Sequence, residues 1–144
     1  MYFDELEVGM SWQTEPVLIE KEKMMDFART YDFMPVHLDE EYAKNSVFGD
    51  LIAPGIMTFM SVWAKFLELN IFTESFLAGQ STKVQWSKPV YAEDVLTGTF
   101  TVTKLIPRNP KNGLVELTLV ACNQKGEPVL SDVTELIIKN KVVG

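Results

Sequence analysis

The most constraining feature of this 144-residue chain is a helical pattern from Pro54 to about Asn70 that is apolar around most of its circumference. Its main apolar face repeats at helical spacing and comprises Ile56, Phe59, Met60, Trp63, Ala64 and Leu67. Met57, Val62 and Phe66 add apolar side chains to the neighbouring faces. A helix with so little polar surface has to be surrounded by other elements, so we expect it to lie at the centre of the fold.

The residues that follow this helix alternate as β-strands do. Four strands are expected, around 82–86, around 100–102, over 114–122 and over 128–138. Residues 123–128 indicate a hairpin, and the prolines, asparagines and glycine of 107–113 predict another connection.

The residues that precede the helix predict shorter elements. We expect a strand over 11–20, a short helix over 21–31 and a brief helix within 38–50, with Asp39 as its N-cap. Together the patterns predict a single α+β domain over residues 1–144, in which an antiparallel sheet curls around the long helix.

The composition restricts the classes of function. The net charge of −7, from 13 Lys and Arg against 20 Asp and Glu, lacks the positive field of a nucleic-acid binder. The acidic first ten residues do not resemble a signal peptide, and no apolar run reaches membrane-spanning length. A single cysteine excludes an internal disulfide. We therefore expect a cytoplasmic protein with no nucleic-acid or membrane partner.

The only histidine, His37, lies in the segment YDFMPVH, five positions after Asp32. Pro35 disfavours a helical conformation at Met34, which predicts a loop that can present both side chains to one cleft. There the imidazole and the carboxylate could act as an acid–base pair. On spacing alone the pattern is more often an aspartate that caps its own turn and a histidine that bonds a backbone carbonyl. No second histidine or nearby cysteine completes a metal site.

The segment LIAPGIMT (51–58) begins the long helix. Pro54 suits a helix start, and Gly55 leaves the backbone open on a side where a ligand could approach. Amide groups at this end could form an anion or oxyanion site. The same residues also suit a buried helix with no ligand.

Taken in order, residues 28–58 resemble the hydratase motif of the MaoC-like acyl dehydratases, which include the (R)-specific enoyl-CoA hydratases. The matching positions are Asp32, Pro35, His37, Asp39, Ala43, Phe48, Gly49, Leu51, Ile52, Ala53 and Gly55. Residues 84–102 and 122–131 resemble later strands and the terminal hairpin of the same family. The resemblance implies a hot dog fold, in which an antiparallel sheet wraps around a long helix.

The resemblance also implies an enzyme, a hydro-lyase that reversibly converts a trans-2-enoyl thioester into a (3R)-3-hydroxyacyl thioester. In that reading Asp32 and His37 hold the reacting water, and the Gly55 amide stabilises charge on the thioester oxygen. The expected substrate contacts are Met34, Ala53, Pro54 and Trp63. Met34 and Trp63 stand where hydratases of the (R)-specific branch have polar or smaller residues, which predicts an acyl site for short or branched chains.

The same resemblance implies no metal or redox cofactor, because coenzyme A or a carrier protein only bears the acyl group. A homodimer or higher oligomer is expected. Candidates to meet the coenzyme phosphates are Lys83, Lys88, Lys104, Arg108 and Lys111. Two alternatives remain open at this stage: a hot dog acyl-CoA thioesterase, and a catalytically silent acyl-CoA-binding subunit.

Overall fold

The computed structural model describes residues 1–141 as an antiparallel sheet with one long helix and several short ones. The strands are β1 (Ser11–Gln13), β2 (Val17–Leu18), β3 (Phe76–Trp86), β4 (Val95–Asn109), β5 (Asn112–Cys122) and β6 (Pro128–Lys139). The helices are η1 (Phe3–Glu5), α1 (Lys21–Tyr31), α2 (Pro35–Leu38), α3 (Glu40–Lys44) and α4 (Gly55–Leu67). The strand order is β1-β4-β5-β6-β3, and β2 pairs separately with β4. None of the helices within residues 1–141 combines the length and apolarity needed to cross a membrane.

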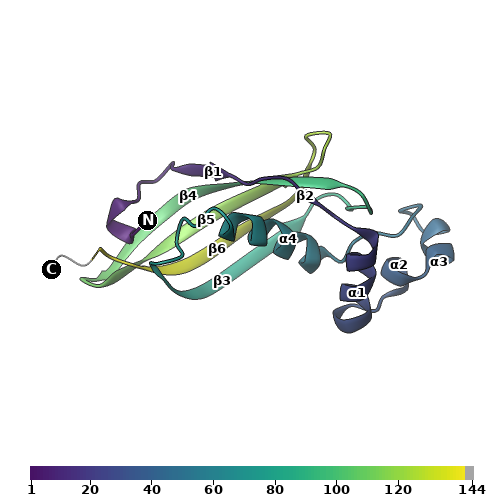
Figure 1. Ribbon diagram of the computed structural model, residues 1–144, viewed down its shortest axis with the longest axis horizontal. Helices are drawn as coiled ribbons and strands as arrows, with labels where there is room; N and C mark the ends of the chain where they lie inside the picture. Colours follow the sequence, from purple (N-terminus) through teal and green to yellow (C-terminus); the bar gives the residue numbers. More distant parts are fainter. Residues whose placement is uncertain (142–144) are drawn as a thin grey trace.

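Figure 1 shows α4 lying across one face of the sheet, with α1, α2 and α3 beyond one end of it. The three central strands bury alternate residues on this face: Leu96, Phe100 and Val102 in β4, Val115, Leu117 and Leu119 in β5, and Leu130, Leu136 and Ile138 in β6. From α4, Val62 and Phe66 enter the same core, and the Phe66 ring stacks on Phe100 with a centroid distance of 4.2 Å. The α+β architecture is confirmed. The expected main apolar face of the long helix is wrong: Ile56, Met60, Ala64 and Leu67 are exposed, and α4 buries Met57, Thr58, Val62 and Phe66 instead, because only one side of the helix packs on the sheet.

Two of the expected elements differ from the structure. The strand expected over 11–20 is divided into β1 and β2, because Pro16 has no amide hydrogen for a continuous ladder. The connection expected over 107–113 shrinks to a tight turn, since β4 runs through Pro107, which pairs with Gly113. The Asn109 side chain closes this turn by accepting hydrogen bonds from the amides of Lys111 (2.8 Å) and Asn112 (3.0 Å).

The helix α4 lies very close to the sheet at Gly98 in β4. A Cβ atom at this position would lie 2.4 Å from Val62 Cγ1 and 3.0 Å from Leu119 Cδ1. Both of these neighbours are fully buried and have little room to move. The absence of a side chain at Gly98 therefore sets how near the helix approaches the sheet.

We expect Gly98→Ala to lower the free energy of unfolding by about 1–3 kcal/mol, because the added methyl group overpacks the core. Gly79→Ala is the matched control, since Gly79 is also a strand glycine without positive φ and a Cβ there would have no neighbour within 4 Å. Urea unfolding of both variants at one protein concentration measures the difference. Equal stability of the two variants would contradict this account.

Candidate active site

The site begins where α1 ends and α2 starts. Asp32 directly follows α1, and its amide donates to the Ala28 carbonyl (3.0 Å). The loop expected over 32–37 is shorter than predicted, because Pro35 occupies the first position of α2 and His37 lies inside that helix. Proline is well suited to a helix start, where its missing amide hydrogen has no intrahelical partner. Met34 is extended, as the residue before a proline should be.

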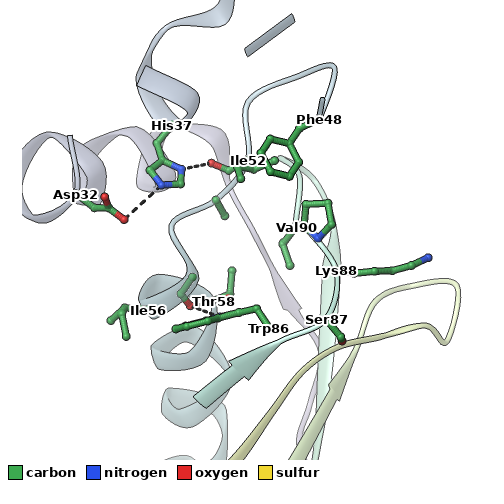
Figure 2. Close-up of a pocket in the computed structure, with 13 residues that line it drawn as sticks. Asp32, His37, Phe48, Ile52, Ile56, Thr58, Trp86, Ser87, Lys88 and Val90 are labelled. Carbon is green, nitrogen blue, oxygen red and sulfur yellow. Dashed lines mark hydrogen bonds and ion pairs between the residues drawn. The ribbon is translucent and has the colours of Figure 1, made fainter. Parts of the chain in front are cut away.

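His37 contacts two acceptors at once. Its Nε2 lies 3.3 Å from Asp32 Oδ2, and its Nδ1 lies 2.7 Å from the Ile52 carbonyl oxygen. A carbonyl can only accept, so Nδ1 carries the hydrogen and Nε2 faces the carboxylate (Figure 2). The histidine is thus bonded to a backbone carbonyl and paired with Asp32 at the same time, so these two sequence interpretations do not exclude each other.

The backbone around the Ile52 carbonyl is held from two sides. The Ile52 amide donates to the Val36 carbonyl (3.3 Å), and Ile52 forms an isolated β-bridge with Tyr91. The next amide, that of Ala53, donates to the Val90 carbonyl (2.7 Å). The acceptor that orients the imidazole is therefore part of a hydrogen-bonded backbone and not of a free loop.

The two members of the pair differ in exposure. The His37 side chain is 10% exposed, whereas the Asp32 side chain is 39% exposed. The imidazole is therefore enclosed by protein, and the carboxylate is open to water or a ligand. This is an arrangement that can present an oriented acid–base pair to a bound molecule.

Both side chains line a cavity of about 490 Å³. Its other lining residues are Phe48, Ile52, Ala53, Gly55, Ile56, Thr58, Trp86, Ser87, Lys88, Pro89 and Val90. Figure 2 shows Asp32 and His37 at one side of this space, Trp86 across the start of α4, and Lys88 at the far side. Apolar walls with a few polar groups at defined positions are typical of a small-molecule site.

The cavity gathers some of the residues expected to contact substrate and omits others. Ala53 lines the cavity beside Gly55, and Pro54 is the N-cap residue of α4 between them. Met34 is 60% exposed and lies outside the lining. Trp63 lies in a different apolar hollow, with Phe66 among its neighbours. The expected contacts of Met34 and Trp63 with the acyl chain therefore stay a prediction, and they would require the chain to extend beyond this cavity.

Gly55 is in contact with Trp86, a residue that the sequence analysis did not single out. A Cβ atom on Gly55 would lie 2.6 Å from Trp86 Cε2. On this side of Gly55, the indole therefore fills the space that was expected for a ligand. The Gly55 carbonyl accepts hydrogen bonds from Trp86 Nε1 (3.0 Å) and from the buried Thr58 Oγ1 (2.6 Å). These two bonds fix the first peptide unit of α4. Gly55 and Trp86 are 31 positions apart, so no local sequence pattern signals this contact.

Comparison with known proteins identifies the family of this chain. Residues 5–123 match the family model described as "MaoC like domain". The chain belongs to this family. The MaoC-like dehydratase from Rhodospirillum rubrum has the same fold, with a TM-score of 0.91, 26% identity and coverage of 99% of each chain. The expected hot dog fold is thereby confirmed.

Two sequence relatives extend the comparison within the MaoC-like family. YdeM from Bacillus subtilis is 29% identical over 96% of this chain and 99% of its own length. The (R)-specific enoyl-CoA hydratase of Rhodospirillum rubrum is 29% identical over 74% of this chain and 72% of its own length. These similarities assign the chain to a family of hydratases and dehydratases.

A double-mutant cycle tests the contact between Gly55 and Trp86. We expect Gly55→Ala alone to destabilise the protein, because the methyl group displaces the indole and its hydrogen bond. In a Trp86→Ala background the same change should be neutral or stabilising, since alanine is favoured over glycine in a helix. Urea unfolding of the four proteins should give a coupling of about 1 kcal/mol or more. Additive effects would show that the two residues do not constrain each other.

Proposed function

We propose that this MaoC-like protein hydrates trans-2-enoyl thioesters to (3R)-3-hydroxyacyl thioesters, with Asp32 and His37 as its acid–base pair. The observation that carries the proposal is the contact between His37 Nε2 and Asp32 Oδ2 in a cavity whose remaining walls are largely apolar. Such walls suit an acyl chain, and the paired polar groups suit one water molecule. The (R)-specific hydratase among the relatives supports this choice of reaction.

The reaction adds a hydroxyl group at Cβ and a proton at Cα. In the starting state that we propose, His37 carries hydrogens on both ring nitrogens and Asp32 is ionised. As the water oxygen bonds to Cβ, the Asp32 carboxylate takes one proton from that water, and His37 Nε2 gives its proton to Cα. Transfer of the proton from Asp32 to His37 restores the pair. Throughout the cycle the Ile52 carbonyl keeps the ring oriented through Nδ1.

The Gly55 amide is our proposed donor to the thioester oxygen, where negative charge develops. This amide opens α4, so its hydrogen has no partner within the helix, and the helix dipole favours an anion there. The bonds from Trp86 and Thr58 to the Gly55 carbonyl keep the first turn rigid, which a preorganised donor requires. One such donor is worth roughly 3–4 kcal/mol of barrier.

We also propose that the protein is a homodimer that pairs through β3. This strand forms the end of the sheet, along the lower edge in Figure 1, and among the strands of residues 1–141 it pairs only with β6. All its residues except Val84 are exposed, and exposed apolar side chains gather there and on α4: Phe76, Leu77 and Trp86 in β3, and Ile56, Met60 and Leu67 in α4. A long apolar edge favours pairing with a second copy.

The activity prediction uses crotonyl-CoA as substrate. Asp32→Asn and His37→Ala should each lower kcat by at least about 100-fold, the usual scale of general acid–base catalysis. Asp26→Asn is the control, because Asp26 is an exposed acid of α1 outside the cavity. Loss of the conjugated absorbance without release of thiol identifies a hydratase, whereas release of thiol would identify the thioesterase alternative. Binding without turnover would instead favour a silent subunit.

Stability measurements separate a catalytic effect from a folding effect in these variants. Asp32 is partly exposed and keeps its size as asparagine, so its loss of stability should stay near 0.5 kcal/mol by the usual surface scale. His37 is buried and hydrogen-bonded, so His37→Ala should cost more, about 1–3 kcal/mol. Full activity in Asp32→Asn would remove the carboxylate from the mechanism.

The dimer prediction uses Gln80→Pro. In the pairing of β3 with β6, Gln80 has no partner residue. Proline at this position therefore removes no paired residue within the chain, but it obstructs pairing of the outer edge of β3 with a second copy. Light scattering should give twice the mass of the chain for the native protein and for Gln80→Ala, and the mass of one chain for Gln80→Pro. A native protein that has the mass of one chain at all concentrations would contradict the proposal.

A further inference from the structure

Lys88 differs from the other basic residues considered for coenzyme phosphates. Of the five candidates, Lys88 alone lines the cavity that contains Asp32 and His37. Figure 2 shows its side chain extending away from this pair, at the opposite side of the cavity. Its Nζ pairs with Glu127 Oε2, and both side chains are partly exposed, at 48% and 38%. The ion pair therefore lies at the rim of the cavity, where solvent can reach it.

Hydrogen bonds hold both members of this ion pair in place. The amides of Ser87 and Lys88 donate to the Val129 carbonyl at 2.9 and 3.3 Å. Glu127 lies in the turn between β5 and β6, and its Oε1 accepts a hydrogen bond from Asn123 Nδ2 (3.2 Å). The hydrogen bond from Lys88, followed by the one from Asn123, lowers the pKa of the Glu127 carboxyl. Glu127 is thus ionised at neutral pH and forms the ion pair with Lys88.

The charge balance at the rim differs from that of the whole chain. Lys125, exposed in the same turn, is a further cation close enough to lower the pKa of Glu127. Two lysines therefore act on the Glu127 carboxylate, and the Asp94 carboxylate accepts a hydrogen bond from Gln124 of the same turn (2.9 Å), while the chain as a whole carries a net charge of −7. An anionic ligand would be repelled by the overall charge and attracted locally at this rim. An exposed ion pair contributes little stability, so a stronger anion can replace Glu127 at small cost.

We propose that Lys88 binds the phosphate at the end of a pantetheine arm, and that Glu127 is the counterion that this phosphate displaces. The inference rests on the proposed function, because the thioester has to lie at Asp32 and His37 while the arm leads to Lys88. Coenzyme A and a carrier protein both supply such a phosphate. Lys88 is a specificity-determining residue that favours phosphate-bearing substrates, and Glu127 weakens their binding by competing for it.

The test compares three crotonyl thioesters, those of pantetheine, 4′-phosphopantetheine and coenzyme A. Lys88→Gln should raise KM about five- to tenfold for the two that bear phosphate and leave KM for the pantetheine thioester within twofold, at low ionic strength. Lys23→Gln, the same charge change at an exposed lysine that is also ion-paired, with Glu20, and lies outside the cavity, should leave all three unchanged. Glu127→Gln should lower KM for the phosphate-bearing pair. Equal effects of Lys88→Gln on all three substrates, or no effect on any, would overturn the proposal.

Two further experiments complete the test. One compares coenzyme A with a carrier protein as the source of the phosphate, and the other distinguishes failure of the phosphate site from failure of the proposed hydratase activity. A crotonyl carrier protein, assayed with the same variants, should respond to Lys88→Gln as the coenzyme A thioester does if its phosphodiester uses the same contact. Calorimetric titration with free coenzyme A measures binding without turnover. Weaker binding by Lys88→Gln in a protein that hydrates nothing would support the phosphate site and reject the hydratase. Normal hydration with no effect of Lys88→Gln would reject the phosphate site alone.

Discussion

The burial of α4 against the sheet is the contact on which the rest of the molecule depends. The helix approaches β4 closely because Gly98 has no side chain, and this approach brings Val62 and Phe66 into the core. The first turn of the same helix carries Gly55 into the wall of the cavity. The packing that stabilises the fold therefore also sets the position of the proposed oxyanion donor. A change in helix position would alter both together.

The candidate site combines a rigid frame with an open side. His37 is fixed by the Ile52 carbonyl, and Gly55 is fixed by Trp86 and Thr58, so the polar groups do not depend on a ligand for their orientation. Asp32 and the ion pair of Lys88 with Glu127 are partly exposed and can exchange partners. Such a division suits an enzyme, because preorganised groups need little rearrangement while exposed groups admit and release substrate.

Much of this arrangement could be read from the sequence, and the reasons for the remainder are physical. Helical spacing revealed α4, and the order of Asp32, His37 and Gly55 indicated the family, because these signals are local. The contact of Trp86 with Gly55 joins residues 31 positions apart, so no local pattern could reveal it. The sequence does not reveal the helix at Pro35, because proline disfavours helix in the preceding residue but suits the first helical position, and the local pattern does not decide between these two effects. Lys88 could not be separated from other lysines until the fold brought it to the cavity.

The cavity is built from two stretches of chain, one that runs into the first turn of α4 and one that begins at the end of β3. Residues 32–58 supply the acid–base pair and the helix start, whereas 86–90 supply the opposite wall, and the bond from the Ala53 amide to the Val90 carbonyl joins them. The two stretches are separated by the rest of α4 and by β3, so only the tertiary structure brings them together. The helices alone therefore do not make the site. A chain that kept its helices but lost the bond between Ala53 and Val90 would retain much of its secondary structure and lose the wall opposite the acid–base pair, so activity would report tertiary contacts that helix content does not detect.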